Sequence, residues 1–226
     1  MFTVEKNKIS NQILFQLRKQ IVLNKISKGY HLNETAIARD FNTSRGPVRE
    51  ALTQLEFENL VEKRSNGRTV VTEFTYKDIE NLYKTRIILE KAALTEIDMK
   101  ALQEGIGKFY QYIEYMEDAY KRGVVETESD LSFHKLIMKL SGNKTFLQLW
   151  LSINGMILTL MDITNEYYLN IRQEDAIYEH LEVIRKMEQG KIEEAQHAIE
   201  LHLKRASDHY MKVVNEIAQE GMIVHD

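Results

Sequence analysis

The chain has 226 residues, of which 43% are hydrophobic and 28% charged, a composition typical of globular proteins of one or two domains. It has no cysteine, which excludes disulfides, thiolate metal sites and cysteine catalysis. It also lacks a signal-peptide pattern and an apolar run of about 18 residues, so we expect a cytoplasmic protein without membrane contact.

The net charge of −4 conceals an asymmetry along the sequence. Residues 1–72 contain twelve Lys and Arg and seven Asp and Glu, a net charge of +5, whereas the remainder carries −9. A basic segment joined to an acidic remainder is typical of a small polyanion-binding module attached to a second domain.

The basic segment has the pattern of three short helices. An apolar stripe that recurs every four residues predicts an amphipathic helix over residues 8–24: Ile9, Ile13, Leu17 and Ile21. Asn33 can cap a short second helix, and Thr43 or Ser44 can cap a third. Pro47 then falls in the first turn of the third helix, where its missing N–H costs least, and Asn59 is expected to end that helix.

Two short β-like runs follow, at residues 60–64 and 69–72. Between them lies the step Asn66-Gly67, and Asn-Gly between two such runs strongly predicts a β-hairpin. Three helices followed by a hairpin that carries Arg64 and Arg68 indicate a winged helix-turn-helix.

Arg45 and Arg49 lie one turn apart beside the apolar face of the third helix, so both guanidinium groups should remain outside the core. Arginine forks at the start of such a helix can read guanine edges in the major groove, and the helix N-terminus suits phosphate oxygens. Alternatively, the two arginines form a solvated, salt-bridged face, with Glu50 as a partner. The turn, the wing and the local charge favour DNA binding. The expected contacts are Thr43, Ser44, Arg45, Gly46, Pro47, Arg49, Arg64, Gly67 and Arg68.

The segment from Gly29 to Val61 resembles the N-terminal domain of GntR-family bacterial transcription regulators. The resemblance is carried above all by the string Ser44-Arg45-Gly46-Pro47-Val48-Arg49-Glu50-Ala51-Leu52. The family usually has an arginine where this chain has Thr35, and often a glycine where it has Asn59.

After a linker at residues 73–77, the sequence predicts six helices and no further strand. Their expected ranges are 76–100, 104–121, 125–141, 144–168, 171–189 and 191–218, with Gly105, Gly123, residues 141–143 and Gly190 near the breaks. The expected architecture is therefore mainly α: a winged helix-turn-helix domain at 1–72 and an antiparallel helical bundle at 78–226.

Five of these helices place a polar group in the middle of an apolar stripe. Burying such groups unpaired costs several kcal/mol each, so they must bind one another or a guest. The stripe of the fourth helix is expected to be Leu147, Leu151, Asn154, Leu158 and Met161. The inward polar residues of the other helices are Arg86 with Glu90, Asp130 with His134, His180, and His202.

Asp130, His134, His180 and His202 together offer one carboxylate and three imidazoles, which facing helices of a bundle can bring to one ion. Without a thiolate, this set suits Zn²⁺, Ni²⁺, Mn²⁺ or Fe²⁺. A small carboxylate or hydroxy-acid could fill open coordination positions. Arg86 would then offer it a bidentate fork and Asn154 an amide.

Each of these residues also has an ordinary structural explanation. An inward histidine is often a satisfied core residue, Asp130 and His134 can form an intrahelical ion pair, and Arg86 can pair with Glu90 four residues later.

The second half resembles the FCD effector domain of the FadR-like branch of GntR regulators. The matching residues are Asp78, Leu82-Tyr83, Arg86, Leu89-Glu90, Asp130 to His134, Ser141-Gly142-Asn143, Glu179-His180, Gly190-Lys191, Ala195 and His202. Metal-binding members of that family use one Asp and three His, which the resemblance transfers to Asp130, His134, His180 and His202. With six rather than seven expected helices, this domain resembles that of the shorter, VanR-like subgroup.

We therefore expect a homodimeric regulator, not an enzyme, that binds double-stranded operator DNA and responds to a small acid. The resemblance implies repression relieved by the effector. One alternative is a metalloenzyme, for which Glu90 and Glu179 are the only nearby candidates for a general base. The other is a regulator whose bundle serves dimerisation alone.

Overall fold

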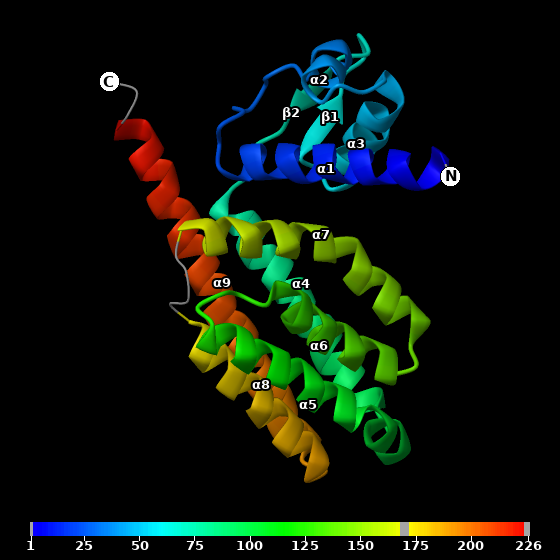
Figure 1. The fold of residues 1–226 in the computed structure, drawn as a ribbon, viewed down its shortest axis with the longest axis vertical. Coiled ribbons are helices and arrows are strands. Elements are labelled where there is room, and N and C mark those ends of the chain that lie inside the picture. The colour runs from blue at the N-terminus through cyan, green and yellow to red at the C-terminus, as the bar shows by residue number, and fades with distance from the viewer. Residues whose placement is uncertain (1, 168–171, 224–226) are drawn as a thin grey trace. The chain divides into compact units, whose positions relative to one another are not determined.

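The computed structural model describes the backbone of residues 2–167 and 172–223 and the side chains of residues 8–167 and 172–219. Over these residues the chain has nine helices and one two-stranded sheet (Figure 1). It divides into two compact units, residues 1–76 with the segment from Val214 onward, and residues 77–213. We retain the predicted domain limits of 1–72, 73–77 and 78–226 as a proposal.

The first unit contains a winged helix-turn-helix. Its elements are α1 (Phe2–Val22), α2 (Glu34–Asp40), α3 (Arg45–Phe57), β1 (Val61–Lys63) and β2 (Thr69–Val71). Helix α1 packs on α3, and the predicted stripe of α1 is buried at Ile13, Leu17 and Ile21. Val48 and Leu55 of α3 are fully buried. The predicted fold of this part is confirmed.

Capping explains where the short helices of this unit begin and end. The Asn33 side chain accepts hydrogen bonds from the amides of Thr35 and Ala36, at 2.9 and 3.1 Å, and so starts α2. Ser44 is the N-cap of α3, although its hydroxyl makes no capping bond. The backbone φ of Asn59 is +58°, beyond the end of α3, which agrees with the predicted stop.

The hairpin is antiparallel, with Val61 opposite Val71. At its tip the Arg64 amide donates to the Arg68 carbonyl at 2.9 Å, and the Gly67 amide donates to the Arg64 carbonyl at 2.8 Å. Gly67 has φ +78°, a conformation that glycine adopts without strain. The wing is therefore a tight, well-bonded turn with Arg64 and Arg68 at its ends.

The second unit is an all-helical bundle built from six helices, as predicted. They are α4 (Tyr76–Glu96), α5 (Met99–Lys121), α6 (Thr127–Leu140), α7 (Lys144–Tyr167), α8 (Gln173–Glu188) and the first part of α9 (Ile192–Ile223). Helix α5 packs on α6 and α8, and α6 packs on α7. Phe109, Phe133, Ile157 and Val183 are fully buried and form part of its core.

The expectation of a helix break near Gly105 is wrong. Helix α5 begins earlier, at Met99, because the Asp98 carboxylate caps it by accepting from the Ala101 amide at 2.7 Å. Gly105 is buried within α5, where α6 approaches closely. A Cβ at this position would lie 2.5 Å from Cδ1 of Leu140.

The predicted buried stripe of α7 is wrong in part: Met161 is buried and Leu147 and Asn154 are half-buried, but the other two residues are exposed. Leu151 and Leu158 are 43% and 37% exposed, whereas Trp150, Ile157 and Leu160 are fully buried. Helix α7 is apolar on several sides, so periodicity could not identify the inward face. Among the described helices, α7 alone is long and apolar enough to cross a membrane by length and composition, a property that core helices of soluble proteins share.

Candidate metal centre and nucleic-acid interface

Three helices of the second unit bring the four predicted metal ligands together. Asp130 and His134 lie one turn apart on α6, His180 lies on α8 and His202 on α9. One ligand atom from each residue lies within 4.8 Å of all the others. The three imidazoles are 0–4% exposed, and the Asp130 side chain is 16% exposed.

Each imidazole is fixed by a hydrogen bond at Nδ1. The partners can only accept, so Nδ1 carries the proton and the Nε2 lone pair is directed to the centre of the group. The three bonds run from His134 to Glu90 Oε2 at 2.6 Å, from His180 to the Ala176 carbonyl at 2.6 Å, and from His202 to Glu179 Oε2 at 2.8 Å.

The Nε2 atoms of His134 and His180 lie 3.1 Å apart. With both protons on Nδ1, two lone pairs face each other, an arrangement that a cation between them stabilises. The separation is also one that two nitrogen ligands adopt when each lies about 2.1 Å from a common ion. The donor set therefore fits a divalent transition metal.

Burial lowers the pKa of His134 and lowers that of His180 well below its ordinary value; the neighbouring His202 and His134 lower the latter further. Both rings are therefore neutral near pH 7, the form that a metal requires. A metal can therefore bind these two histidines without displacing a proton from a charged imidazole.

Glu90 and Glu179 are each bound to cationic groups in addition to a histidine. Glu90 Oε1 accepts from Arg86 Nε at 2.7 Å and from the Trp150 indole at 2.9 Å. Burial alone would raise the pKa of Glu90, but His134 and Arg86 outweigh it and hold the pKa below its usual range.

Glu179 accepts from Arg205 Nη1 at 2.6 Å and from Arg172 Nη2 at 3.0 Å. Both carboxylates therefore orient histidines, and neither is a free general base. Sequence reasoning identified them near the site but did not find this orienting role, because periodicity does not reveal which inward groups pair.

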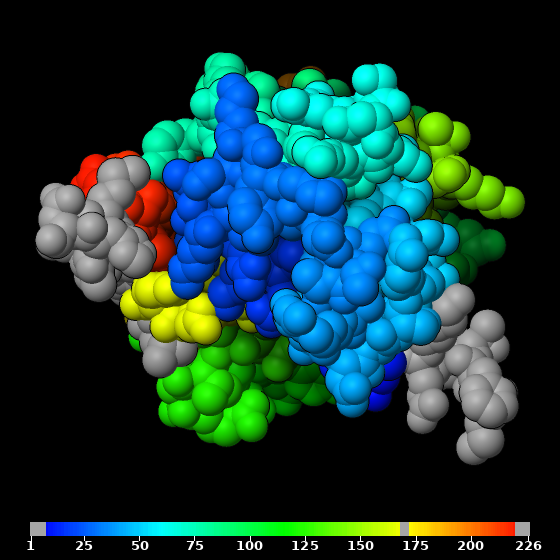
Figure 2. Space-filling model, turned by 90° about the horizontal axis from the view of Figure 1, so that it is seen from above, coloured from blue at the N-terminus to red at the C-terminus, as the bar shows by residue number. Residues whose placement is uncertain are grey.

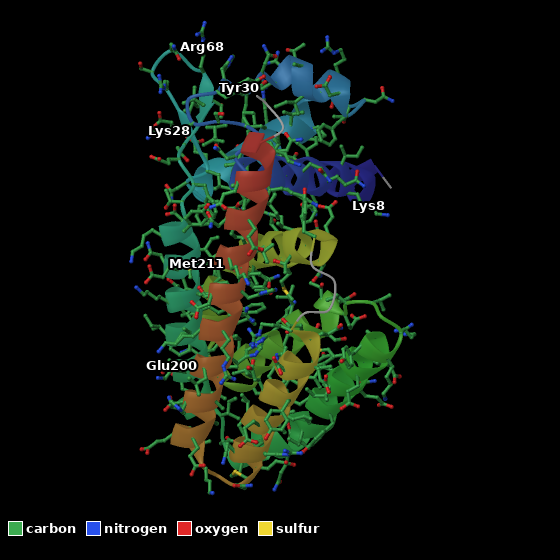
Figure 3. All side chains as sticks on the ribbon, turned by 90° about the vertical axis from the view of Figure 1, so that its left-hand side faces the viewer. Lys8, Lys28, Tyr30, Arg68, Glu200 and Met211 are labelled. Carbon is green, nitrogen blue, oxygen red and sulfur yellow. The ribbon has the colours of Figure 1, made fainter. Side chains whose placement is uncertain are left out.

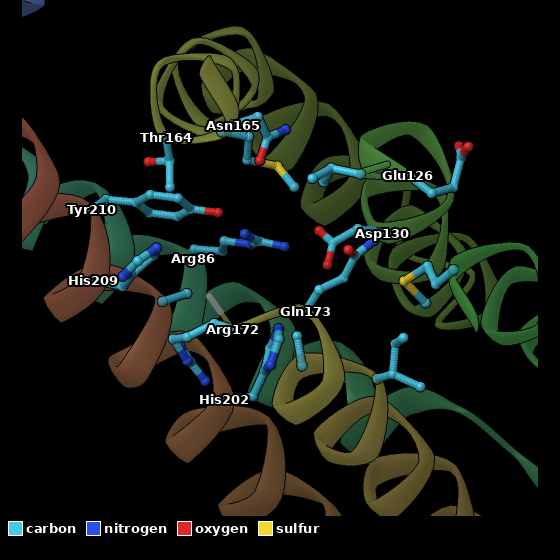
Figure 4. Close-up of a pocket in the computed structure, with 16 residues that line it drawn as sticks. Arg86, Glu126, Asp130, Thr164, Asn165, Arg172, Gln173, His202, His209 and Tyr210 are labelled. Carbon is cyan, nitrogen blue, oxygen red and sulfur yellow. The ribbon is translucent and has the colours of Figure 1, made fainter. Parts of the chain in front are cut away.

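A cavity of about 100 Å³ lies beside the four ligands and is lined by Asp130, His202, Arg86 and Tyr210, among others (Figure 4). Figure 4 shows the Arg86 guanidinium directed toward Asp130, with the Tyr210 ring alongside. This volume is below that of pockets for drug-sized ligands and suits a small molecule.

Three lining groups carry a buried polar atom without a hydrogen-bond partner among the described residues. They are Arg86 Nη2, Thr164 Oγ1 and Gln173 Oε1. The Gln173 amide nitrogen donates to the Val124 carbonyl at 3.0 Å, which leaves Oε1 as the free acceptor. Buried polar atoms nearly always have partners, so these three positions call for water or a polar guest.

Asn154, predicted to contact an effector, does not line this cavity. It lies on α7 two turns before Met161, the first α7 residue of the lining, and two turns of helix are about 11 Å. Asn165 lines the cavity in its place. Asn154 Oδ1 is itself buried without a hydrogen-bond partner among the described residues, so its contact with an effector stays a prediction.

Most of the residues predicted to contact DNA lie on the surface of the first unit. The segment that carries them, blue to cyan in Figure 2, is exposed on the face shown there, and Figure 3 shows Arg68 at the tip of the hairpin. Exposed members are Ser44, Arg45, Arg49, Arg64, Gly67 and Arg68, and half-buried members are Thr43 and Gly46. Pro47 lies on the buried face of α3, so its ring cannot offer the expected contact.

Arg45 and Arg49 both pair with Glu34 of α2. Glu34 Oε2 accepts from Arg45 Nη2 at 2.6 Å and from Arg49 Nε at 2.9 Å. The two arginine side chains remain 54% and 60% exposed, so both forks are accessible.

The comparisons with known proteins agree with this two-part organisation. The model of "Bacterial regulatory proteins, gntR family" matches residues 9–71, and that of the "FCD domain" matches residues 81–205. The HTH-type transcriptional regulator YdhC of Bacillus subtilis (strain 168) is 28% identical over 91% of this chain and 92% of its own length.

The gluconate operon transcriptional repressor of the same organism is 27% identical over 73% of this chain and 68% of its own length. Among solved structures, Lar, which controls expression of the Listeria monocytogenes agr system, superposes with a TM-score of 0.62. The identity is 18%, over 90% of this chain and 96% of that one, so this likeness concerns the fold alone.

Proposed function

The chain belongs to the GntR family of bacterial transcription regulators with an FCD domain, and from this premise we propose that it is a homodimeric repressor that senses a small acid through a metal-loaded helical domain. The observation that carries the sensing part is the convergence of four metal-ligand groups beside a cavity with unsatisfied polar atoms. The name of the gluconate operon repressor supports the sense of regulation.

Asp130, His134, His180 and His202 would hold the ion, with the histidines oriented by Glu90, Glu179 and the Ala176 carbonyl. Bound there, a divalent metal would offer open coordination positions to oxygen atoms of the effector. The donor set fits Zn²⁺, Ni²⁺, Mn²⁺ or Fe²⁺, and supply in the cell selects among them.

The unsatisfied polar atoms of the cavity suggest the chemistry of the effector. Arg86 Nη2 is a fixed cationic donor and suits a carboxylate. Gln173 Oε1 can only accept, so it requires a hydroxyl or amine donor on the guest, and Thr164 can serve either role. A small hydroxy-acid carries a partner for each of the three atoms, whereas a simple carboxylate carries none for Gln173 Oε1.

At the other unit, Arg45 and Arg49 would read guanine edges in the major groove of double-stranded operator DNA. Thr43, Ser44 and Gly46 would contact phosphate at the start of α3, and Arg64, Gly67 and Arg68 would contact an adjacent part of the duplex. Two copies of this surface in a homodimer would match a pseudo-palindromic operator in the cytoplasm. The effector can change the affinity for DNA only if it binds one arrangement of the dimer more tightly than the other and so shifts the equilibrium between them.

Metal analysis of protein purified without chelator tests the sensing domain. We expect up to one transition ion per chain, lost in His180→Ala and retained in His197→Ala, a change of an exposed histidine outside the group. The proposed centre is contradicted if the two variants have the same metal content and if metal changes their melting temperatures equally. That result would support a bundle that serves dimerisation alone.

The effector class is tested with metal-loaded protein and pairs of short acids with and without a 2-hydroxyl. The hydroxy-acid should raise the melting temperature more than its deoxy partner, and Gln173→Leu should remove that difference while Arg86→Lys weakens binding of both. Equal responses to both acids in wild type would contradict the role of Gln173. The acid that binds should then release DNA in an electrophoretic shift assay.

A further inference from the structure

One carboxylate connects the two arginines of α3. Glu34 is the first residue of α2, and its Oε2 accepts from Arg45 Nε at 3.0 Å, from Arg45 Nη2 at 2.6 Å and from Arg49 Nε at 2.9 Å. Three donors on two forks therefore share a single oxygen atom. This contact brings both guanidinium groups to one position on the surface.

Local structure fixes this carboxylate in place. The Asn33 cap sets the start of α2, so the backbone of Glu34 is fixed relative to its own helix. Helix α2 also packs on α3. The Glu34 side chain is only 29% exposed, compared with 54% and 60% for Arg45 and Arg49.

Glu34 is ionised at neutral pH. The hydrogen bond from Arg45 is the largest influence on the pKa of Glu34; with the Arg49 contact it outweighs partial burial, and the pKa lies below its usual range. The first turn of a helix further favours a negative charge. An ionised carboxylate therefore lies within the surface that offers arginine forks to DNA.

Such a carboxylate affects the two kinds of DNA contact differently. Phosphate oxygens carry negative charge along the whole duplex, so Glu34 repels them and competes with them for the arginines. A guanine edge is neutral and accepts a fork through O6 and N7 in one geometry. Exposed ion pairs are weak, so a guanine that accepts both N–H groups of a fork can replace the contact with Glu34 without bringing a second negative charge close to it.

We propose that Glu34 is a specificity-determining residue of the DNA-binding unit: it withholds Arg45 and Arg49 from phosphates and yields them to correctly placed bases. This inference rests on the DNA-binding role of the first unit and adds a selective function to an acidic residue in a basic surface. It concerns discrimination between duplexes rather than affinity alone.

The test compares full-length wild type with Glu34→Gln, which keeps the size of the side chain and removes its charge. The probes are a duplex selected by wild type from a random pool and a scrambled duplex of the same length and composition. Glu62→Gln is the matched control, because Glu62 accepts from Arg64 in the wing at 3.3 Å and its loss changes the net charge equally.

For Glu34→Gln we expect affinity for the scrambled duplex to rise about tenfold, and affinity for the selected duplex to change by less than about threefold. The slope of log affinity against log salt on scrambled DNA should steepen by about 0.9 for each additional phosphate that the released arginines neutralise. Glu62→Gln should change both affinities by the same factor. Glu34→Asp, which shortens the reach but keeps the charge, should reduce discrimination less than Glu34→Gln.

The inference is overturned if Glu34→Gln and Glu34→Asp both retain the wild-type ratio of the two affinities. A wild-type protein that enriches no sequence from the pool would instead contradict the proposed function itself. The two failures are therefore distinguishable, because the first requires a wild type that selects a duplex.

Discussion

Glu90 binds three buried polar side chains beside the metal-ligand group. It accepts from His134, Arg86 and Trp150, and all four side chains are almost fully buried. Removing its charge would leave the buried Arg86 guanidinium without the carboxylate to which it is hydrogen-bonded. Breaking a buried ion pair in this way costs about 3–5 kcal/mol.

We therefore predict that Glu90→Gln lowers the free energy of unfolding by about 3–5 kcal/mol and weakens metal binding by about 10- to 100-fold. Urea denaturation of metal-free protein and a competition titration with a chelator measure the two effects. Glu80→Gln is the control, since Glu80 lies on the same helix but pairs with Lys77 and Lys84 at the surface. Equal metal affinities in the two variants would show that Glu90 does not orient His134.

The buried histidines predict how stability depends on pH. Folding lowers the pKa of His134 and His180 below about 6.5, so between the lowered values and 6.5 the unfolded chain binds more protons than the folded one. The contribution of these two histidines to the free energy of unfolding of the metal-free protein should therefore be complete above pH 6.5. It should fall as the pH drops below that value. The maximum slope is about 1.4 kcal/mol per pH unit for each histidine.

Urea unfolding at a series of pH values between about 7.5 and 5 checks this prediction. His180→Gln should make the profile shallower, because one of the two depressed groups is gone. A profile of the metal-free wild type that is flat across this range would contradict neutral, buried imidazoles. A further loss is expected below about pH 4.5, where Glu179, whose folded pKa is about 2, begins to protonate in the unfolded chain.

At this scale the sequence was most informative where chemistry and periodicity coincide. Asp130, His134, His180 and His202 were identifiable because an ionisable group at the centre of an apolar face needs a partner, and the structure brings them together. Gln173 and Thr164 were not identifiable, because they lie at the ends of helices, where a helical pattern no longer distinguishes inside from outside. Glu34 was missed because its partners are eleven and fifteen residues away on another helix.

At the scale of elements, most helix ranges followed from the sequence, apart from the boundary between α4 and α5, but the packing between helices did not. Capping residues and glycines mark where a helix ends, and they are local signals. Helix α7 was predicted at 144–168 and found at Lys144–Tyr167, yet its inward face was misassigned in part. The choice among several apolar faces depends on the neighbours that the fold supplies, and no local pattern encodes it.

Helix α5 offers a matched pair of glycines that tests this distinction. Gly107 is exposed, and a Cβ there would meet nothing within 4 Å, whereas one at Gly105 would meet Leu140 of α6. We predict that Gly107→Ala stabilises the protein by about 0.5–1 kcal/mol, the gain of alanine over glycine inside a helix. Gly105→Ala should be less stable than Gly107→Ala, because the Leu140 side chain must move.

Thermal and urea denaturation of the two variants and wild type measure these differences. If Gly105→Ala proved as stabilising as Gly107→Ala, the close approach of α5 and α6 would not constrain residue 105. If Gly105→Ala were more stable than Gly107→Ala, helix propensity would not explain the effect of alanine in α5.

At the scale of the whole molecule, the division of charge predicted the two-domain organisation but not the assembly. The basic first part and the acidic remainder matched the two family models, because net charge reflects the partner that a domain meets. Self-association leaves no such charge signature in one chain, because an interface between identical copies is marked by exposed apolar surface, which only the fold reveals. The exposed apolar residues of α7 are the feature from which a dimer surface can be argued.

Leu151 and Leu158 lie on one face of α7 and are 43% and 37% exposed. They are spaced by seven residues, so both can contact the same partner surface. Burying apolar surface contributes about 25 cal/mol per Å², and an aspartate in its place would be buried without a counter-ion. We predict that Leu151→Asp with Leu158→Asp weakens self-association and, with it, operator binding, while one metal ion per chain is retained.

Light scattering after size-exclusion chromatography gives the oligomeric state, and an electrophoretic shift gives the DNA affinity at the same protein concentration. Leu149→Asp is the control, because Leu149 is 49% exposed on the same helix but points about 160° away from Leu151. A dimer that survives the double change, or one that Leu149→Asp dissociates as readily, would place the interface elsewhere. Loss of DNA affinity without loss of the dimer would show that α7 acts on the DNA-binding unit rather than on the partner copy.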